Sequence, residues 1–505
     1  MHVVFRTDAS ELLGLGHAMR CFALAQALMR SGATATFLVR HMPSSVKQRL
    51  QAAGISVIAM DTAQAEEGAD PRLGVSAARD AADSRRALAA LGTVHWLVVD
   101  HYALDAGWES SLRGQVQRIA VIDDLDDRPH DCDLLVDQNP GVSESPRYQL
   151  HAPPGALRLL GPRYALLRQE FAAARELPLT VRRKVRRVLV AFGGADPTGG
   201  SAFVLAALAP LVFEGLSLDV VLGATAQGSD LARSVAELPN AHLHLDVADM
   251  TQLYRSADLA IGAAGTSAWE RCALGLPTVL LSLTEKQSQG AEALAALGGS
   301  VHLGRATAES IVALTGLVRA LAHSPDWLSV LSRQAAEVCD GQGAARVAAR
   351  MESFDMQLRV ATLEDADDLL SWRNHEVNRR HAVDARPITK ARHMEWMRQS
   401  LEDADRVLLI AEDEIGPVGV LRYDIAFGIA TVSIYLAPGR HGQGRGGVLL
   451  LAGEEWIMAH RPEVQAIDAR ILVDNTASMN VFLESGYLPD SHHLSKALNR
   501  PEKVK

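Results

Sequence analysis

Short runs of β-branched and apolar residues alternate with alanine-rich stretches of helical periodicity through most of the first 350 residues. In one such stretch, residues 18–32, apolar side chains recur at the i, i+3, i+4 and i+7 positions from Cys21 to Leu28, and Gly32 ends the pattern. Two successive strands that are joined through a helix can lie parallel in one sheet. The alternation therefore predicts an α/β fold with parallel, doubly wound sheets.

Two similar series of strands follow one another before residue 350, and a third pattern begins near residue 357. Two α/β halves that are joined by a short linker usually clasp a ligand in the cleft between them. The third part contains segments that look like antiparallel strands, at 406–424 and 429–438. We therefore expect three domains, at residues 1–165, 166–350 and 357–500. The strands expected in the first two are residues 2–8, 33–39, 54–60, 95–101, 118–124, 186–194, 216–223, 241–247, 258–265 and 277–283.

The composition is that of a globular protein, with 48% hydrophobic and 22% charged residues among 505. A formal net charge of −10 disfavours binding to nucleic acid, and the basic run at residues 182–187 is better suited to a strand entry or a hinge. The four cysteines are far apart, which predicts neither a disulfide framework nor a bound metal. There is no signal-like region and no apolar run of spanning length, so we expect a cytoplasmic protein without a membrane partner.

The sequence GLGH lies between the first expected strand and the first expected helix. Ligands of α/β sheets collect where strands end and helices begin, so this position suits a site residue. Gly14 and Gly16 allow a ligand to approach closely, and His17 can act there as a general base. A capping or packing histidine beside a glycine turn explains the same spacing equally well.

In the second half, glycine and hydroxyl residues stand where two further helices are expected to begin. Backbone N–H groups at such positions can bind a phosphate, although a structural glycine turn is the alternative for the first group. Glu270 falls one turn inside the second helix, where a carboxylate either accepts hydrogen bonds from a ribose or complements the helix dipole. The residues at the two helix entrances are Gly193 and Gly194 in the first group, and Gly265, Thr266 and Ser267 in the second.

The segment GTSAWERCALGLPTVLL, residues 265–281, resembles the nucleotide-binding segment of GT-B-type glycosyltransferases. It is most similar to the enzymes that add N-acetylglucosamine to the lipid-linked muramyl precursor of peptidoglycan. The resemblance implies a GT-B-like pair of Rossmann-type domains in which Glu270 holds the uridine ribose. It also assigns the diphosphate to the three residues at the helix entrance, and the donor sugar to Gln287 in the segment EKQSQGAEALAALG.

Four separated motifs within residues 1–345 resemble the UDP-sugar hydrolases of pseudaminic acid biosynthesis, namely FRTDASELLGLGHAMRCFALA, AVIDDLDDRPHDCDLLVDQNP, LLGPRYALLRQEF and VAFGGADP. The resemblance implies hydrolysis of UDP-2,4-diacetamido-2,4,6-trideoxy-β-L-altrose to the free sugar and UDP, with His17 activating the attacking water. The sequence shows no cluster of metal ligands, so we expect the reaction to need no metal. Asp123 and Asp124 are weaker candidates, because a solvated acidic turn explains them equally well. Arg6 and Asp8 either orient the histidine or bind substrate. The other residues implied in substrate binding are Gly14, Gly16, Arg20 and, as a weaker candidate, Asn139.

A glycine-rich turn at residues 439–447 separates an expected strand from an expected helix, so its N–H groups can converge on a pyrophosphate. Together with RVATLEDADDLLSWRNHE before it and ARILVDNTASMNVFLESGYLPD after it, the turn resembles the GNAT superfamily over residues 357–495. The resemblance implies an N-acetyltransferase that uses acetyl-CoA. The implied cofactor-binding residues are Ile434, Leu436, His441, Gly442, Gly444, Arg445, Gly446 and Asn475.

Two positions depart from the usual GNAT pattern. His441 stands at the first position of the loop, where the family carries glutamine or arginine. Phe482 stands where many members carry a tyrosine that protonates the leaving thiolate, which leaves this role to Tyr487, another group or solvent. Candidates for the base that accepts the amine proton are His375, Glu376 and His393.

The sequences SWRNHEVNRR and HMEWM narrow the resemblance to nucleotide-sugar N-acetyltransferases of the pseudaminic pathway, with Trp372, Arg373 and Asn374 shaping the acceptor site. A core tryptophan beside a salt-bridging arginine is the alternative. The two resemblances name successive steps, acetylation of a UDP-4-amino-4,6-dideoxy-N-acetyl-altrosamine and hydrolysis of the product. The expected partners are therefore UDP-linked amino sugars and acetyl-CoA, with at most a weak association with other enzymes of the pathway. A GT-B glycosyltransferase, an enzyme for legionaminic-type sugars and a non-catalytic nucleotide-sugar sensor remain alternatives.

Overall fold

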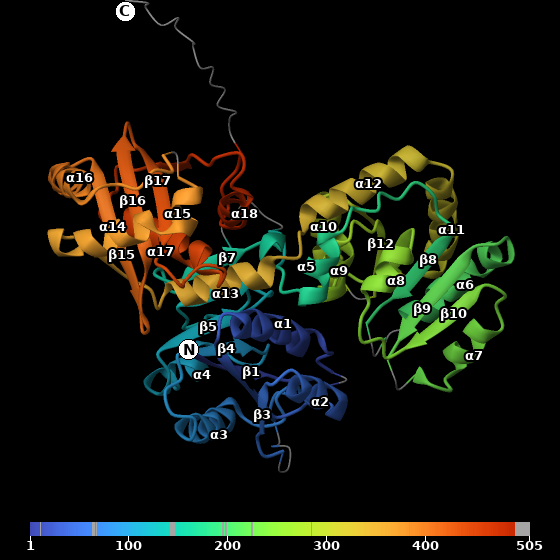
Figure 1. The fold of residues 1–505 in the computed structure, drawn as a ribbon. Coiled ribbons are helices and arrows are strands. Elements are labelled where there is room, and N and C mark those ends of the chain that lie inside the picture. The colour runs from blue at the N-terminus through green and yellow to red at the C-terminus, as the bar shows by residue number, and fades with distance from the viewer. Residues whose placement is uncertain are drawn as a thin grey trace, which may run out of the picture. The chain divides into compact units, whose positions relative to one another are not determined.

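A computed structural model describes residues 1–505 except 11, 63–65, 67, 142–146, 194, 195, 197, 198, 224, 225, 284, 383 and 490–505. The side chains of residues 285, 286 and 308 are likewise outside the description. The chain divides into two compact units, Met1–Ala348 and Ala349–Lys505 (Figure 1). Within the described residues, the first unit contains two sheets and the second unit contains one.

The first sheet is entirely parallel, with the strand order β3-β2-β1-β4-β5-β6-β7. Its central strands are buried along nearly their whole length, which explains their continuous apolar sequences. Five strands lie where the alternation predicts them, whereas β6 and β7 were not predicted. The strands are β1 (His2–Thr7), β2 (Thr34–Val39), β3 (Ser56–Ala59), β4 (Trp96–Asp100), β5 (Arg118–Ile122), β6 (Leu134–Asp137) and β7 (Leu157–Leu160).

The predicted first helix is confirmed as α1 (Gly16–Arg30), which packs on β1 and β2. Its buried face includes Cys21 and Leu28, as the periodicity predicts, and Gly32 follows the helix with a φ of 92°. No side chain caps the N-terminus of α1, because the residue at the N-cap is Leu15. The other helices of this half are α2 (Ser44–Ala52), α3 (Ala77–Ala89), α4 (Ala106–Ser110) and α5 (Gln169–Glu176).

The second sheet repeats this plan, with parallel strands in the order β10-β9-β8-β11-β12-β13. Each sheet places the first strand of its own series beside the fourth, which is the strand order of Rossmann-type domains. The predicted pair of doubly wound α/β halves is therefore confirmed. The strands are β8 (Arg187–Ala191), β9 (Ser217–Leu222), β10 (Ala241–Leu245), β11 (Leu259–Gly262), β12 (Thr278–Ser282) and β13 (Ser300–Arg305).

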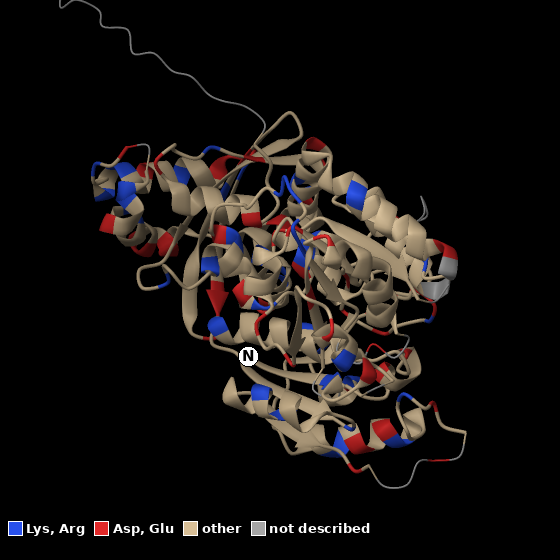
Figure 2. Ribbon diagram, turned by 90° about the vertical axis from the view of Figure 1, so that its right-hand side faces the viewer, with Lys and Arg blue, Asp and Glu red and all other residues tan. Residues whose placement is uncertain are grey.

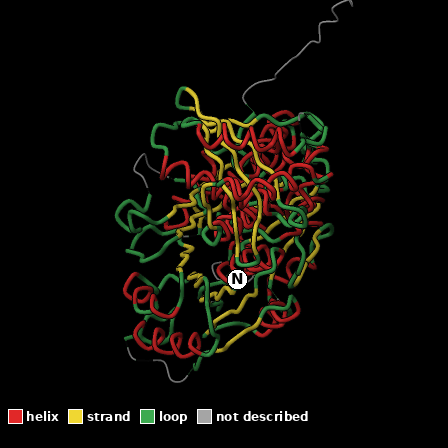
Figure 3. The backbone as a smooth tube through the Cα atoms, turned by 60° about the vertical axis from the view of Figure 1, so that its left-hand side comes forward, coloured by secondary structure: helices red, strands yellow, loops and turns green. Residues whose placement is uncertain are grey.

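Helices alternate with strands along this half. Figure 3 draws the helices of the whole chain in red and its strands in yellow. Leu208 of α6 and Leu314 of α11 are fully buried in one apolar core of the second sheet. Trp269 of α9 belongs to a separate core, which also contains Leu280 of β12. The helices are α6 (Gly200–Phe213), α7 (Asp230–Ala236), α8 (Thr251–Ser256), α9 (Thr266–Ala273), α10 (Glu285–Ala296), α11 (Ala308–Ala322), α12 (Pro325–Val338) and α13 (Gly343–Ser353), which runs from the first unit into the second.

Arg182, the first residue of the basic run at 182–187, has a structural role. The Arg182 guanidinium is buried and donates hydrogen bonds to backbone carbonyl oxygens, including those of Leu274 at 2.5 Å, Gly275 at 2.9 Å and Tyr254 at 2.9 Å. Burial lowers the pKa of Arg182 to about 10. Arg187 begins β8, so the run flanks a strand entry, as the sequence suggests.

The second unit contains a mixed sheet with the strand order β14-β15-β16-β17-β18. The first four strands pair in antiparallel fashion and β18 pairs parallel to β17, so the predicted third α/β unit with antiparallel strands is confirmed. The strands are β14 (Gln357–Val360), β15 (Arg406–Asp413), β16 (Gly416–Ala426), β17 (Ile429–Leu436) and β18 (Ala466–Ala469). The helices are α14 (Ala366–Asn374), α15 (Glu376–Arg380), α16 (Lys390–Glu402), α17 (Arg445–His460) and α18 (Thr476–Glu484).

Charged residues of both signs are interspersed along the ribbon (Figure 2). All four cysteines are buried and free. In the part of the chain that the structure describes, no helix combines the length and the apolar character needed to cross a bilayer. Over the same residues, no group of three or more histidine, cysteine, aspartate and glutamate side chains is gathered in a way that suits a metal ion.

Candidate functional sites

His17 lies at the carboxyl edge of the first sheet, where β4 ends beside β1. Its side chain is almost fully buried in the first turn of α1, and its Nδ1 lies 2.6 Å from Oδ1 of Asp100, the last residue of β4. Although burial acts in the opposite direction, Arg20 and His17 hold the pKa of Asp100 well below its usual range. Asp100 is therefore an anion that accepts the Nδ1 proton, which leaves the lone pair of Nε2 available as a base.

Neighbouring side chains fix this pair in place. Arg20, one turn later on α1, donates to both carboxylate oxygens of Asp100 at 2.7 Å, and its Nη1 lies 3.0 Å from Asp124. Tyr102 packs edge-to-face against His17, with 4.4 Å between the ring centroids. A carboxylate and an aromatic ring thus hold the imidazole in one orientation, as a general base requires. The predicted residues His17, Arg20 and Asp124 are brought together.

Sequence analysis did not identify Asp100, which it treated only as part of a strand. The signal was present, because a carboxylate ends an otherwise apolar strand there. The Rossmann strand order places the fourth strand of a series beside the first, and therefore beside the loop that carries His17. An acid at the end of that fourth strand therefore lies within reach of the histidine.

Arg6 and Asp8 belong to a different buried network. The Arg6 guanidinium lies 2.9 Å from Asp8, and it donates to Asp80 at 2.7 and 3.1 Å. Asp8 also accepts the backbone N–H groups of Arg40 at 2.6 Å and His41 at 2.9 Å. Both side chains are fully buried, and Arg6 ties β1 to α3 while Asp8 holds the loop after β2. The orienting role that the sequence offered to them lies with the acid at the end of β4.

Asp123, the acidic candidate next to Asp124, stabilises the turn that follows β5. Asp123 is fully buried and accepts the N–H groups of Leu125 at 3.1 Å and Asp126 at 3.0 Å, together with the hydroxyl of Tyr148 at 2.9 Å. Its burial argues against a solvated acidic turn at this residue. Asp123 therefore supports the loop beside Asp124 rather than facing solvent.

Asn139 follows β6 on the same carboxyl edge, two strands away from β4. Its backbone N–H donates to Asp137 at 2.8 Å. Burial raises the pKa of Asp137 to about 7, against the opposing effect of its ion pair with Arg147. Asn139 thus borders a buried carboxyl group that changes charge near neutral pH.

The predicted nucleotide-binding segment meets the histidine loop within the first unit. Helix α9 begins at Thr266, with Gly265 as its N-cap and no side chain capping its first N–H groups. A Cβ atom built on Gly16 would lie 3.3 Å from Oγ1 of Thr266. The loop that carries His17 and the N-terminus of α9 therefore border one region, although they lie about 250 residues apart in the sequence.

Two further predicted nucleotide-sugar residues have partners within the second half. Glu270 accepts a hydrogen bond from the Tyr254 hydroxyl at 3.2 Å, and Arg168 lies 3.5 Å from its other carboxylate oxygen. Burial raises the pKa of Glu270. Tyr254 and Arg168, which sequence analysis did not identify, thus orient this carboxylate one turn inside α9. Gln287 accepts the N–H of Leu283 at 2.9 Å, near the start of α10.

The other predicted anion site contains a carboxylate of the protein. Gly193 follows β8 with a φ of 97°, and Gly194 lies outside the described residues. Asp196 accepts the N–H groups of Gly200 and Ser201, at 2.9 and 2.8 Å, in the first turn of α6. Because this carboxylate already binds the N-terminus of α6, the geometry favours the structural turn.

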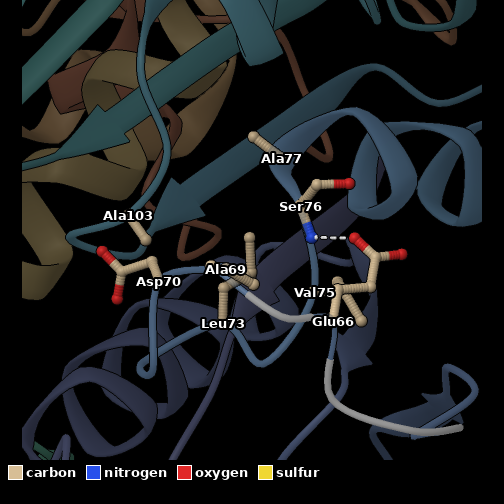
Figure 4. A pocket seen from close by; sticks show the side chains of 9 residues that line it. Glu66, Ala69, Asp70, Leu73, Val75, Ser76, Ala77 and Ala103 are labelled. Carbon is tan, nitrogen blue, oxygen red and sulfur yellow. Dashed lines mark hydrogen bonds between the residues drawn. The ribbon is translucent and has the colours of Figure 1, made fainter.

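A pocket of about 320 Å³ lies between the loop after β3 and the start of α3 (Figure 4). Glu66, Asp70 and Ala103 contribute to its wall, and the Glu66 carboxylate accepts the N–H of Ser76 at 2.7 Å. The residues that line it do not include any that the sequence predicts for a site. The pocket and the predicted histidine site therefore have no residue in common.

In the second unit, the glycine-rich turn lies between β17 and α17. Gly442 and Gly444 have φ values of 74° and 72°, and Gly444 forms the N-cap of α17 without a side-chain cap. Successive N–H groups in such a turn, followed by the positive end of a helix, form an anion-binding backbone. A Cβ on Gly446 would lie 3.4 Å from Val481, so this position lies close to α18.

Strand β17 has an open backbone edge next to this turn. Pairing with β18 involves Ile429–Val432 and stops there. On the other side, the N–H of Ala437 donates to Val418 at 2.9 Å, so the alternation of an antiparallel pair directs the odd-numbered residues towards β16. Ile434 and Leu436 therefore direct their backbone groups to the side where β18 has ended.

The predicted acceptor residues lie in the last turn of α14 and hold the following loop. Trp372 is buried in the apolar core. Arg373 donates to the carbonyl oxygen of Asp384 at 2.7 Å, so its hydrogen bond goes to the backbone rather than to a carboxylate. The Asn374 side chain makes two hydrogen bonds with the backbone of Ile388, at 2.9 and 2.8 Å.

Residues 355–487 match the family model described as acetyltransferase (GNAT) domain. The C-terminal unit contains a GNAT acetyltransferase domain. The match confirms the coarse prediction for this part of the chain, which rested on the glycine-rich turn and the segments on either side of it.

Two curated proteins and one solved structure are similar to the whole chain or to parts of it. Over 522 aligned positions the chain is 20% identical to the protein MJ1062 of Methanocaldococcus jannaschii, with 96% of each chain covered. Over 197 positions it is 31% identical to the spore coat polysaccharide biosynthesis protein SpsG of Bacillus subtilis, which covers 38% of this chain and 58% of that protein. The crystal structure of MurG from Acinetobacter baumannii is similar at 15% identity and a TM-score of 0.48, covering 70% of this chain and 99% of that one.

The residues of the GNAT domain fit an acetyl-CoA ligand. Beyond its pairing with β18, β17 offers the backbone of Ile434 and the N–H of Leu436 to an extended chain, because the Leu436 carbonyl oxygen already accepts a hydrogen bond from Asn378 at 2.9 Å. The turn that follows offers N–H groups to a diphosphate. Arg445 lies 3.6 Å from Glu352 at the start of α17. Asn475 has a structural contact, because its side chain caps α18 by accepting the N–H of Ser478 at 3.1 Å.

The candidate acid of the GNAT domain packs against the phenylalanine that replaces the usual tyrosine. The rings of Phe482 and Tyr487 meet edge-to-face, with 4.8 Å between centroids. Burial and the Glu454 carboxylate raise the pKa of Tyr487 above its usual range, so its phenol stays protonated. Burial also raises the pKa of Glu454 to about 7.

The three candidate bases of the GNAT domain have different neighbours. His375 stacks on His441, Glu376 forms an ion pair with Arg380 at 3.1 Å, and His393 is buried on α16.

Proposed function

We propose that the chain is a bifunctional nucleotide-sugar enzyme. In this proposal the GNAT domain acetylates an amino sugar that is linked to UDP, and the first unit then releases UDP by hydrolysis. The hydrolytic half rests on one observation, the His17–Asp100 pair at 2.6 Å in a loop that adjoins Thr266 and the N-terminus of α9. The similarity to a spore coat polysaccharide biosynthesis protein supports a carbohydrate substrate.

The motif resemblance supplies the sugar in this proposal. The acceptor is a UDP-4-amino-4,6-dideoxy-N-acetyl-altrosamine, and the acetylated product is hydrolysed to free 2,4-diacetamido-2,4,6-trideoxy-L-altrose and UDP. These are successive steps of pseudaminic acid biosynthesis. Fusion of the two catalysts in one chain raises the local concentration of each site near the other's product.

In the proposed hydrolysis, Nε2 of His17 accepts a proton from water while the water oxygen attacks the anomeric carbon. The bond between that carbon and the diphosphate oxygen breaks, and UDP leaves with the bonding electrons. The N–H groups at the start of α9 stabilise the leaving charge, and Asp100 stabilises the imidazolium. A single displacement of this kind inverts the anomeric centre, and the proton then passes from His17 to solvent.

In the proposed acetylation, acetyl-CoA supplies the acetyl group as a thioester when it is bound. The backbone of Ile434 and Leu436 aligns the pantetheine chain along β17, and the N–H groups of the glycine-rich turn bind the diphosphate. Arg373 and Asn374 hold the loop at residues 384–388, which borders the acceptor in this arrangement.

Mass spectrometry of reactions with the purified full chain tests this proposal. Given the UDP-4-amino sugar, we expect formation of the free diacetamido sugar and UDP only when acetyl-CoA is present. His17→Ala should abolish UDP release and leave acetylation intact, whereas normal hydrolysis by this variant contradicts the assignment of the base.

Other outcomes would redirect the assignment. An acetylated UDP-sugar that stays intact until an acceptor is added supports a GT-B glycosyltransferase. If only a legionaminic-type substrate is turned over, the two proposed reactions stand and the proposed sugar is replaced. Binding of both ligands without turnover supports a nucleotide-sugar sensor.

A further inference from the structure

Asn378 joins the start of α15 to the cofactor turn of the GNAT domain. Its Nδ2 donates to the carbonyl oxygens of Trp372 at 2.8 Å and Leu436 at 2.9 Å. Because the amide nitrogen faces two carbonyls, the amide oxygen faces the other way, and it lies 2.9 Å from Nε2 of His441. A carbonyl oxygen can only accept, so Nε2 of His441 carries a proton.

This hydrogen bond determines what His441 can do at its second ring nitrogen. In the neutral ring Nδ1 has only a lone pair, which repels a phosphate oxygen. In the imidazolium Nδ1 carries a proton and can donate it in a charge-assisted hydrogen bond. Glutamine or arginine, the residues expected at this position, would donate at any physiological pH. Histidine thus replaces a permanent donor by one that must first take up a proton.

The position of His441 suits a phosphate contact. It immediately precedes Gly442 and the positive-φ turn that leads to the uncapped N-terminus of α17. His375, which begins α15, stacks on it with 6.1 Å between ring centroids and 14° between planes. Burial and His375 both lower the pKa of His441, so the ring is neutral at neutral pH until an anion approaches.

The other charged groups around this turn are already paired. Asp413, at the end of β15, is bound by Arg440 at 2.8 Å and lies 3.8 Å from Arg445. Glu352, at the end of α13, lies 3.6 Å from Arg445. These ion pairs occupy the carboxylates and guanidinium groups named here, so the response to an incoming phosphate falls to the imidazole of His441.

We propose that the diphosphate of the cofactor binds together with one proton, which His441 takes up from solvent at Nδ1 while Asn378 holds Nε2. This inference rests on the proposed use of acetyl-CoA by the GNAT domain. Affinity is then highest below the pKa of His441 in the free protein. It falls as the pH rises through the window up to the higher pKa that His441 has in the complex, and is constant above it. Within that window the change is at most about tenfold per pH unit.

Calorimetric titration of the purified full chain with CoA tests the proposal, from about pH 5.5 to about pH 8.5, the range in which histidine ionises. Buffers of different ionisation enthalpy report the number of protons taken up, and we expect net uptake of up to one. Pantetheine, which lacks the diphosphate, should bind without this pH dependence. His441→Gln keeps a donor that does not titrate, so its CoA affinity should be independent of pH.

Two further variants separate the proposed role from a structural one. Asn378→Asp places a carboxylate against Nε2, which raises the pKa of His441 and should move the pH window upwards. His460→Gln removes an exposed histidine at the far end of α17 and should behave as the unmodified chain does. An unchanged pH dependence in His441→Gln, or the same dependence with pantetheine, overturns the proposal. Absence of CoA binding at every pH overturns the acetyltransferase assignment itself.

Discussion

At the scale of single residues, the candidate chemistry depends on side chains that are distant in sequence. His17 was recognisable from its glycine loop, but its partner Asp100 lies 83 residues later and looks like the end of an ordinary strand. Asn378 was equally hidden, because its importance follows from three hydrogen bonds and not from a motif. Motifs in loops thus indicated the groups that the proposals assign to ligand binding, whereas the residues that hold those groups in place became visible only through tertiary contacts.

Asp100→Asn should disable hydrolysis while leaving the protein folded. An amide keeps the size of the side chain but loses the charge that stabilises the imidazolium, and it can hold His17 in the wrong tautomer. We expect kcat for UDP release to fall by about a thousandfold or more with a small change in KM. Asp127→Asn alters a partly exposed acid of the neighbouring turn and should retain activity. Equal losses in both variants would argue against the pair, and calorimetric binding of UDP, which involves the same unit, serves as the check of folding.

Glu270 should make UDP binding sensitive to acid. Its pKa is raised by burial, so it takes up a proton at a higher pH than an ordinary glutamate does. Only the carboxylate can accept hydrogen bonds from both ribose hydroxyls, so affinity should decrease as the pH falls through that raised pKa. Glu270→Gln should bind UDP about tenfold more weakly at neutral pH and show a flat profile. Calorimetry of UDP binding checks this, and a variant that keeps the acid sensitivity would remove Glu270 from the nucleotide site.

At the scale of helices and strands, the periodicity of the sequence was sufficient for most of the first unit. Buried parallel strands are continuous apolar runs, so β1, β4 and β8 were easy to predict, while the four-residue strands β6 and β7 were not. The order of the strands within each sheet came from general rules of topology and not from local patterns. The basic run at 182–187 shows that composition does not predict the burial of a charged residue, since its first arginine lies inside the protein.

Arg182→Lys should destabilise the second half of the first unit. The guanidinium donates to five carbonyl oxygens, those of Thr180, Tyr254, Ala257, Leu274 and Gly275. A lysine has three donors on one atom and leaves some of these buried acceptors unpaired, so the free energy of unfolding should fall by about 2–4 kcal/mol. Urea denaturation measures the loss. Arg183→Lys is the control, because its side chain is 60% exposed and the change should lie within about 0.5 kcal/mol.

At the scale of the whole molecule, the chain combines two compact units with separate candidate chemistries. The first unit carries the histidine pair and the α9 entrance, and the second carries the glycine-rich turn and the open edge of β17. Each set of residues lies within its own unit, so damage to one should leave the other reaction intact.

Gly444→Trp tests this independence together with His17→Ala. A tryptophan at a φ of 72° is strained, and it obstructs the N-terminus of α17. We expect loss of acetylation and normal hydrolysis of pre-acetylated UDP-sugar, the reverse of the effect of His17→Ala. Gly416→Ala, at the first residue of β16, introduces a side chain at another positive φ and should retain acetylation. Loss of both reactions in Gly444→Trp would mean that the units depend on each other for folding or activity.

The short pairing between β17 and β18 has a consequence for the life of the protein in a cell. Backbone groups that protrude from the side of a sheet can recruit a strand from another molecule, which is how many proteins begin to aggregate. Ile434 and the N–H of Leu436 form such an edge in the second unit, next to the place proposed for pantetheine. Bound coenzyme would therefore block aggregation through this edge as well as supply the acetyl group. The supply of coenzyme would then influence both the lifetime of the enzyme and its rate.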